Sequence, residues 1–403
     1  MKKIVMFILL ALISTSVISQ AVAVDTINIQ SKVFNSQRRV MVALPGNYHS
    51  YIDQKYIVAY LFDAQSDDFF NFYKATVNYL VSLGYMNPVI LVGIVSDNRQ
   101  FEFTSKPQTA KGVKYFAKSG GSDLLASYLQ DEVMPLIEKK YRCLDYNIGI
   151  GHSLGATFVT DCLLRYPKLF NANIAVSPNY IFDQQQLVHK FDSARDYSIF
   201  NHKFLYLAHG SGDRMENSFK PATDTVGSML RARNIPGLRW QFKPLENDDH
   251  GLTAMEGIFK GLVVLFRQFT LTEKDSLVDS FYRDSSKPFM EHVKGFYQSV
   301  SDWAGLKLPL IDDVNGLGYN CFYTNKKKEA LEVFAWGLSL YPDNINLYDS
   351  MGELQQKSGN KKEALDYYNR GLKIVQSQRN QLDAATYNGM IAGFENRIKS
   401  VNN

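Results

Sequence analysis

Short apolar runs recur at intervals through the first two thirds of this 403-residue chain, and most are followed by a stretch with helical periodicity. The segments that predict strands are 39–44, 56–62, 88–95, 146–150, 172–178, 203–210 and 238–246. The segments that predict helices are 67–83, 124–141 with a kink at Pro135, 154–167, 214–233 and 253–269. Strands that are apolar on both faces suit a parallel sheet covered by helices. The fold class that follows is α/β, a doubly wound and mostly parallel sheet in residues 24–271.

After residue 271 no segment predicts a strand, and an internal repeat begins. Four pairs of positions match at an offset of 34 residues: Gly318 and Gly352, Ala330 and Ala364, Phe334 and Tyr368, Gly337 and Gly371. This offset is the period of tetratricopeptide helix pairs. We predict a helical linker at 272–310 and tetratricopeptide-like helical repeats at 311–403. Because a repeat stack contacts mainly its neighbours, we expect the sheet to have a core of its own.

The first residues predict an export signal at 1–23. Lys2 and Lys3 precede a short apolar run at 4–13, and Ala21-Val22-Ala23 has the small-residue pattern of a cleavage site. The prediction is a periplasmic or secreted protein, and an uncleaved membrane anchor is the alternative. No later segment is long and apolar enough to predict a membrane span in the mature chain.

Charge and cysteine content exclude several classes of protein. The formal net charge is only +4, which gives no basis for nucleic-acid binding. Three cysteines, Cys143, Cys162 and Cys321, are too few for a disulfide scaffold, and we expect free thiols, with a Cys143–Cys162 bond as the alternative. We expect no cofactor and no metal.

The stretch Gly151-His152-Ser153-Leu154-Gly155 lies between a predicted strand and a predicted helix. In that setting the pattern G-x-S-x-G predicts a sharp turn that exposes a nucleophilic serine, here Ser153. Glycines at both ends of the turn remove side chains that would collide. The backbone N–H of Leu154, at the start of the helix, is a candidate donor to an oxyanion. A chance glycine-rich turn is the alternative.

A serine nucleophile needs a base, and an acid that orients the base. His250 follows the last predicted strand in the polar loop "NDDHGL" and is the predicted base, with His209 as second choice. Asp213, shortly after the strand 203–210, is the predicted acid. Glu216, another acid such as Asp248 or Asp249, or a serine–histidine pair without an acid remain the alternatives. His152 is expected to pack behind the serine.

A second oxyanion donor is expected from the turn after the strand 56–62. That turn reads Asp63-Ala64-Gln65, and the backbone N–H of Ala64 is the candidate.

The chain resembles the Putative esterase family of α/β-hydrolases, which includes esterase D-type and siderophore-esterase-like members. The resemblance covers roughly residues 26–270 and rests on "RRVMVALPGNY", "AYLFDA", "GHSLGATFVTDCLLRYPKLFNANIAVSPNY" and "DDHG". It implies an α/β-hydrolase domain that cleaves carboxylic esters through a serine–histidine–acid triad and an acyl-enzyme. Ser153 and His250 match the family pattern, and Asn98, Arg99 and Tyr180 are candidates for the substrate site. Ala64 stands where many members have a glycine.

The function predicted on these grounds is a serine esterase acting on a small-molecule ester, with helical repeats available to a protein partner. Two other classes compete with this prediction. One is a binding or scaffold protein that carries an inactive hydrolase domain. The other is an acyltransferase on the same fold, since some relatives transfer acyl groups to acceptors other than water.

Overall fold

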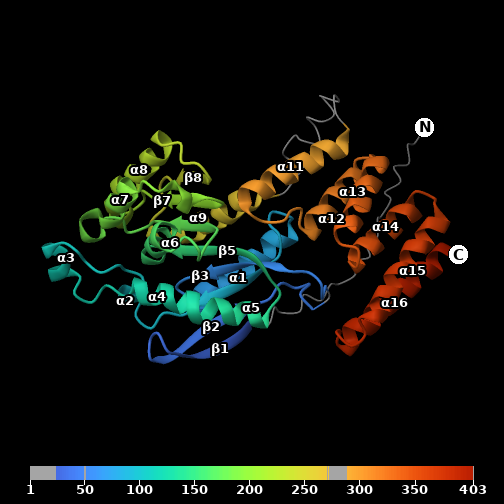
Figure 1. Cartoon of the computed structure of the whole chain (residues 1–403), viewed down its shortest axis with the longest axis horizontal. Coiled ribbons are helices and arrows are strands. Elements are labelled where there is room, and N and C mark those ends of the chain that lie inside the picture. The colour runs from blue at the N-terminus through green and yellow to red at the C-terminus, as the bar shows by residue number, and fades with distance from the viewer. Residues whose placement is uncertain (1–23, 50, 270, 272–287, 403) are drawn as a thin grey trace, which may run out of the picture.

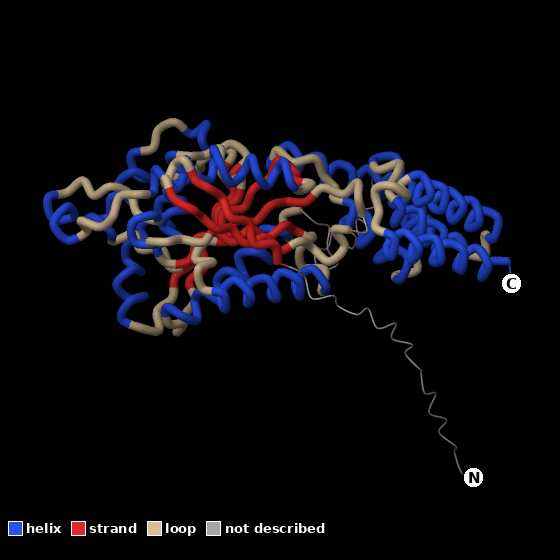
Figure 2. The backbone as a smooth tube through the Cα atoms, turned by 90° about the horizontal axis from the view of Figure 1, so that it is seen from below, coloured by secondary structure: helices blue, strands red, loops and turns tan. Residues whose placement is uncertain are grey.

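The computed structural model describes residues 24–49, 51–269, 271 and 288–402. The predicted export signal at 1–23 and the first part of the predicted linker lie outside the described residues. A central sheet and a bundle of helices lie at opposite ends of an elongated molecule (Figures 1 and 2).

The sheet has eight strands in the order β1-β2-β4-β3-β5-β6-β7-β8. Their bounds are β1 Val24–Ser31, β2 Ser36–Ala43, β3 Tyr56–Leu61, β4 Val89–Ile94, β5 Cys143–His152, β6 Ala172–Val176, β7 Lys203–His209 and β8 Leu238–Pro244. Every pair from β4 to β8 is parallel, whereas β1 pairs with β2, and β2 with β4, in antiparallel fashion. The predicted mostly parallel α/β sheet is confirmed, and β1 was not predicted.

Helices cover both faces of the sheet, and their bounds are α1 Asp67–Ser82, α2 Arg99–Glu102, α3 Ala110–Tyr115, α4 Ser122–Tyr128, α5 Met134–Lys140, α6 Leu154–Arg165, α7 Phe182–Ser193, α8 Arg214–Ala232 and α9 His250–Phe266. One apolar layer contains residues of α1 and α9 and the other contains residues of α4 to α8. The predicted helix 124–141 is in pieces, since a π-helical turn at Leu129–Val133 separates α4 from α5 just before Pro135. Proline has no N–H for a regular helical bond, which accounts for the irregular turn.

The second part of the described chain is helical, with α11 Phe289–Ala304, α12 Ile311–Tyr323, α13 Lys327–Leu340, α14 Ile345–Lys357, α15 Lys361–Ser377 and α16 Ala384–Asn402. An identical type of contact occurs twice at the offset found in the sequence. A Cβ on Gly318 would meet the ring of Phe334, and a Cβ on Gly352 would meet the ring of Tyr368. Such a contact suits stacked helix pairs, and the tetratricopeptide assignment stays a prediction.

The sheet and the helical module share one core, contrary to the expectation from the sequence. Tyr297 of α11 and Leu317 of α12 belong to the same buried cluster as Ile57 of β3 and Phe266 of α9. The sheet therefore buries part of its apolar surface against the helices that follow it.

Hydrogen bonds also cross this junction. Nδ1 of His202 lies 2.8 Å from the carbonyl oxygen of Trp303, and Nδ2 of Asn87 donates to Asp313 at 2.9 Å. Across the described ranges, no helix combines the length and the apolar character that a bilayer span requires.

Candidate active site

Ser153 occupies the turn between β5 and α6 with a backbone conformation that non-glycine residues rarely adopt, φ 57° and ψ −118°. Its N–H donates to the carbonyl oxygen of Val176 at 2.9 Å, which fixes the turn to the neighbouring strand β6. A Cβ on Gly151 would lie only 2.2 Å from the carbonyl carbon of Gly155, so the turn requires glycine there. This strained serine at a strand–helix junction has the geometry of a nucleophile elbow.

His250 is the first residue of α9, and its ring nitrogen Nδ1 lies 2.5 Å from Oε1 of Glu216. Glu216 is fully buried, and its other oxygen accepts the backbone N–H of Gly210 at 2.6 Å. Burial would raise the pKa of Glu216, but the hydrogen bonds from His250 and Gly210 outweigh it and hold that pKa below its usual value. Glu216 is thus a buried carboxylate that fixes the orientation of the His250 ring.

Asp213, predicted to contact the His250 ring, lies elsewhere. It is the N-cap of α8 and accepts the backbone N–H of Glu216 at 2.7 Å and that of His250 at 3.0 Å. These two bonds hold the pKa of Asp213 below its usual value. Asp213 therefore joins the starts of α8 and α9 and sets the distance between the histidine and its carboxylate, without touching the ring.

The sequence contained a signal for this arrangement. Asp213-x-x-Glu216 is the pattern of a capping box, in which the first residue caps the helix and the fourth faces back toward its start. Here the Glu216 side chain reaches back to Gly210 and His250 instead of to its own N-cap.

His152, next to the serine, packs its ring against the ring of His250 with centroids 4.4 Å apart. Its Nε2 lies 3.2 Å from Oγ1 of Thr253. Burial, together with the nearby His250, lowers the pKa of His152 to about 3, so this ring is neutral at physiological pH. The contact brings His250 to the elbow that carries Ser153.

The second-choice base, His209, is buried away from this group. Its Nε2 lies 3.0 Å from Asp224, and its Nδ1 lies 2.7 Å from the carbonyl oxygen of Gly210. Both ring nitrogens are therefore engaged, and the geometry favours His250.

The two expected oxyanion donors differ in availability. Leu154 is the first residue of α6, and an N–H at this position has no acceptor within its helix. The N–H of Ala64, by contrast, donates to the carbonyl oxygen of Ile94 at 3.1 Å. Because that bond continues the sheet ladder, the proposal of Ala64 as a donor must be corrected. The preceding residue, Asp63, has a positive φ of 69°, and its carboxylate lies beside Gly155 of the elbow.

The candidates for the substrate site separate in the structure. Arg99 lies near the elbow, since it holds both oxygens of Asp63 at 2.7 and 3.0 Å, and a Cβ on Gly155 would be 3.4 Å from the same carboxylate. Asn98 caps α2 by accepting the N–H of Phe101. Tyr180 is buried in the core with its hydroxyl 2.8 Å from Oγ1 of Thr160, which leaves it unsuited to contact a substrate.

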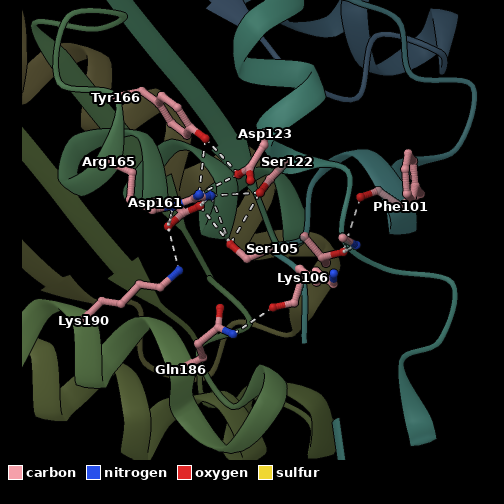
Figure 3. Close-up of polar contacts among 12 residues, drawn as sticks. Phe101, Ser105, Lys106, Ser122, Asp123, Asp161, Arg165, Tyr166, Gln186 and Lys190 are labelled. Carbon is pink, nitrogen blue, oxygen red and sulfur yellow. Dashed lines mark hydrogen bonds and ion pairs between the residues drawn. The ribbon is translucent and has the colours of Figure 1, made fainter. Parts of the chain in front are cut away.

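The far end of α6 is anchored by a polar network (Figure 3). Arg165 pairs with Asp161 and Asp123 and donates to Oγ of Ser122 at 3.0 Å. Lys190 of α7 also pairs with Asp161, at 3.6 Å. The helix that begins at Ser153 is thereby fixed to α4 and α7, which limits movement of the elbow.

Within the described ranges, no group of three His, Cys, Asp or Glu side chains could hold a metal ion. All three cysteines are free.

Comparison with known proteins gives a match to one family model and a fold. A family model described as Putative esterase matches residues 31–217, a range that holds Ser153 and Glu216 but ends before His250. The ferri-bacillibactin esterase BesA of Bacillus subtilis is 24% identical over 179 residues, or 40% of this chain. The match spans 62% of that relative, which is less than two thirds of its length.

Two crystal structures share the architecture. An IroE-like serine hydrolase from Shewanella oneidensis has a TM-score of 0.67 at 19% identity, over 79% of this chain and 100% of that one. An uncharacterised protein from Capnocytophaga ochracea has a TM-score of 0.60 at 16% identity, over 94% of this chain and 99% of that one. These likenesses concern the fold, which is that of the α/β-hydrolases. The residues that match the Putative esterase model, 31–217, include the serine elbow and the buried glutamate.

Proposed function

We propose that the protein is a carboxylic ester hydrolase in which Ser153 is the nucleophile, His250 the base and Glu216 the acid. The observation that carries the proposal is the combination of a strained serine at a strand–helix turn with a histidine held by a buried carboxylate at 2.5 Å. The match of residues 31–217 to the Putative esterase family supports the class of reaction.

In this mechanism Oγ of Ser153 attacks the ester carbonyl carbon while His250 takes the hydroxyl proton. Glu216 holds the ring and stabilises the imidazolium that forms. The N–H of Leu154 donates to the oxyanion of the tetrahedral intermediate. His250 then gives its proton to the departing alcohol, which leaves an acyl group on Ser153. Water, deprotonated by His250, attacks this acyl-enzyme and releases the carboxylic acid.

The position of the serine supports the second half of this cycle as well. Because α6 is anchored through Arg165 at its other end, the elbow and the Leu154 N–H can keep one geometry through both attacks. Export to the periplasm or beyond, predicted from residues 1–23, and a protein partner for the helical repeats are further parts of the proposal that rest on the sequence pattern alone.

A serine-reactive fluorophosphonate probe tests the proposal directly. Labelling should occur on the native chain and be lost in Ser153→Ala, while kcat on a p-nitrophenyl ester falls by as much as about 10⁶-fold in that variant. Ser339→Ala is the control, since Ser339 is an exposed serine of α13 whose hydroxyl donates only to the carbonyl oxygen of Trp336. If the native chain takes up no label and cleaves no ester, the protein is a scaffold that carries an inactive hydrolase domain.

A further inference from the structure

A cavity of about 610 Å³ lies where the sheet meets the helical module, far from Ser153. One wall is the end of α1 and the turn into β4, residues 81–88, and the facing wall is α12. The cavity is at the edge where the parallel strands begin, whereas the Ser153 turn follows the end of a strand. Cavities of this size accommodate small organic molecules, often between domains.

Two aspartate carboxylates line this cavity, and neither is paired with a cationic side chain among the described residues. Asp312 and Asp313 are neighbours in the first turn of α12. Asp312 accepts Nε2 of Gln54 at 2.8 Å, and Asp313, only 7% exposed, accepts Nδ2 of Asn87 at 2.9 Å and the N–H of Leu310 at 3.1 Å. In the part of the chain that the structure describes, neither carboxylate forms an ion pair. Buried carboxylates are normally paired with a cation.

The other side chains that line the cavity do not supply a cation for these carboxylates. Arg267 is the one cation among the described lining residues, and it is exposed and does not pair with either aspartate. Asn87 lines the cavity at 3% exposure; its amide nitrogen donates to Asp313, and its buried Oδ1 has no hydrogen-bond partner. The cavity thus offers two unpaired carboxylates, with the buried amide of Asn87 beside Asp313.

The walls around these acceptors are apolar and aromatic. Leu83 and Tyr323, which line the cavity, are 50% and 70% exposed, high fractions for such large side chains. A molecule with an apolar body would remove both from water. Leu317 and Pro88 contribute further apolar lining.

We propose that this cavity is a second binding site, which takes a primary amine with an apolar or aromatic body. The ammonium group has three N–H donors, and the carboxylates of Asp312 and Asp313 supply acceptors. Its positive charge also favours the ionised form of both side chains. A divalent cation fits less well, because calcium and magnesium take six or more oxygen ligands. Since both modules contribute walls, the bound amine stabilises their junction.

The test uses the full chain and two probes of equal shape, 2-phenylethylamine and the uncharged 2-phenylethanol. Isothermal titration calorimetry should detect the amine, and thermal unfolding should shift upward with amine concentration. Phenylethanol should bind at least about tenfold more weakly, since it lacks the charge that the carboxylates would pair. Equal binding of both probes, or of neither, would overturn the proposal.

Two glycine substitutions that should not disturb folding give a second test of the amine site. Gly316 lines the cavity in α12, and a Cβ there meets nothing within 4 Å, so the side chain of Gly316→Met begins in open space and should narrow the cavity. Gly295→Met in α11 is the matched control, because its Cβ also meets nothing within 4 Å and the residue is outside the lining. Gly316→Met should weaken amine binding by about tenfold or more, and Gly295→Met should leave it unchanged. Unchanged binding in Gly316→Met, or a calcium-induced rise in Tm that this variant removes, would refute an amine site.

Discussion

Glu216 places Oε1 2.5 Å from Nδ1 of His250 and is fully buried, whereas Asp213 contacts the same histidine only at its backbone N–H. Both acids therefore orient His250, but each contacts a different part of it. Glu216 fixes the ring, and Asp213 fixes the main chain of both partners.

Because the contacts differ, removing the negative charge of Glu216 and removing that of Asp213 should lower kcat by different amounts. Glu216→Gln should lower kcat by about 10² to 10⁴-fold, because the ring loses the carboxylate that stabilises its protonated form. Asp213→Asn keeps an oxygen that can accept a backbone N–H, so we expect a smaller loss. Steady-state kinetics on one p-nitrophenyl ester compare them, with Asp248→Asn as a control. A greater loss in Asp213→Asn than in Glu216→Gln would contradict the assignment of the acid.

The elbow predicts a contrast between two glycines close to the site. Gly151→Ala should abolish activity and lower Tm, because its Cβ would lie 2.2 Å from the backbone of Gly155. Gly251→Ala, beside His250, should be tolerated, since its Cβ meets only Oδ1 of Asp249 at 3.4 Å. Thermal unfolding and ester hydrolysis measure both. An active, stable Gly151→Ala enzyme would be incompatible with the tight turn.

The Arg99–Asp63 pair predicts a role for Arg99 in positioning the turn beside the elbow. Arg99→Met should leave the largely buried carboxylate of Asp63 without its cation and lower kcat/KM by about tenfold or more. Arg99→Lys keeps the charge and should retain part of the activity. The comparison of kcat/KM for both variants on one ester decides this. Equal kcat/KM in wild type and Arg99→Met would show that the Arg99–Asp63 pair does not contribute to catalysis.

Asp313 predicts a dependence of stability on pH. Burial raises the pKa of Asp313 to about 7, although the Asn87 and Leu310 bonds oppose the rise. The folded state therefore holds a proton that the unfolded chain releases near pH 4, and the free energy of unfolding falls between about pH 4 and pH 7. Asp313→Asn removes this contribution, so its Tm should decrease less than that of wild type between about pH 5 and pH 8. Identical Tm changes in the two proteins would refute the assignment.

The shared core predicts that a chain ending at residue 271 will not fold as a stable hydrolase. Such a chain would expose the buried surface that α11 and α12 cover, including Phe266 and Phe269. Soluble yield and ester hydrolysis measure the effect. Removal of α16 alone is the control, because its Phe394 packs with Tyr368 of α15 in a separate cluster. A soluble, fully active chain ending at residue 271 would contradict this prediction.

The sequence predicted the elements whose pattern is local. Apolar runs located β3 to β8, and the glycines around Ser153 located the elbow, because both signals lie within a few neighbouring residues. Strand β1 escaped prediction, since its exposed and half-buried residues alternate at the edge of the sheet and do not form an apolar run.

Contacts between distant segments were harder to predict. The choice between Asp213 and Glu216 depends on where α8 begins and on which way a buried side chain turns, and both follow from packing against α9. The N–H of Ala64 was assigned to an oxyanion because the sequence does not reveal that a strand neighbour, Ile94, accepts it. The shared core escaped prediction because the apolar residues of α11 and α12 do not indicate which surface they cover.

The junction between the sheet and α12 also bears on how the protein is made. A nascent chain that has emerged as far as His250 already contains Ser153, Glu216 and His250, the residues proposed as nucleophile, acid and base, yet the starting edge of its sheet is still uncovered. That edge is covered only after residues 289–323 have been synthesised and packed. The proposed catalytic residues are thus present in the chain well before the helices that complete this core, and we expect that a hydrolase domain transferred to another protein would have to include α11 and α12.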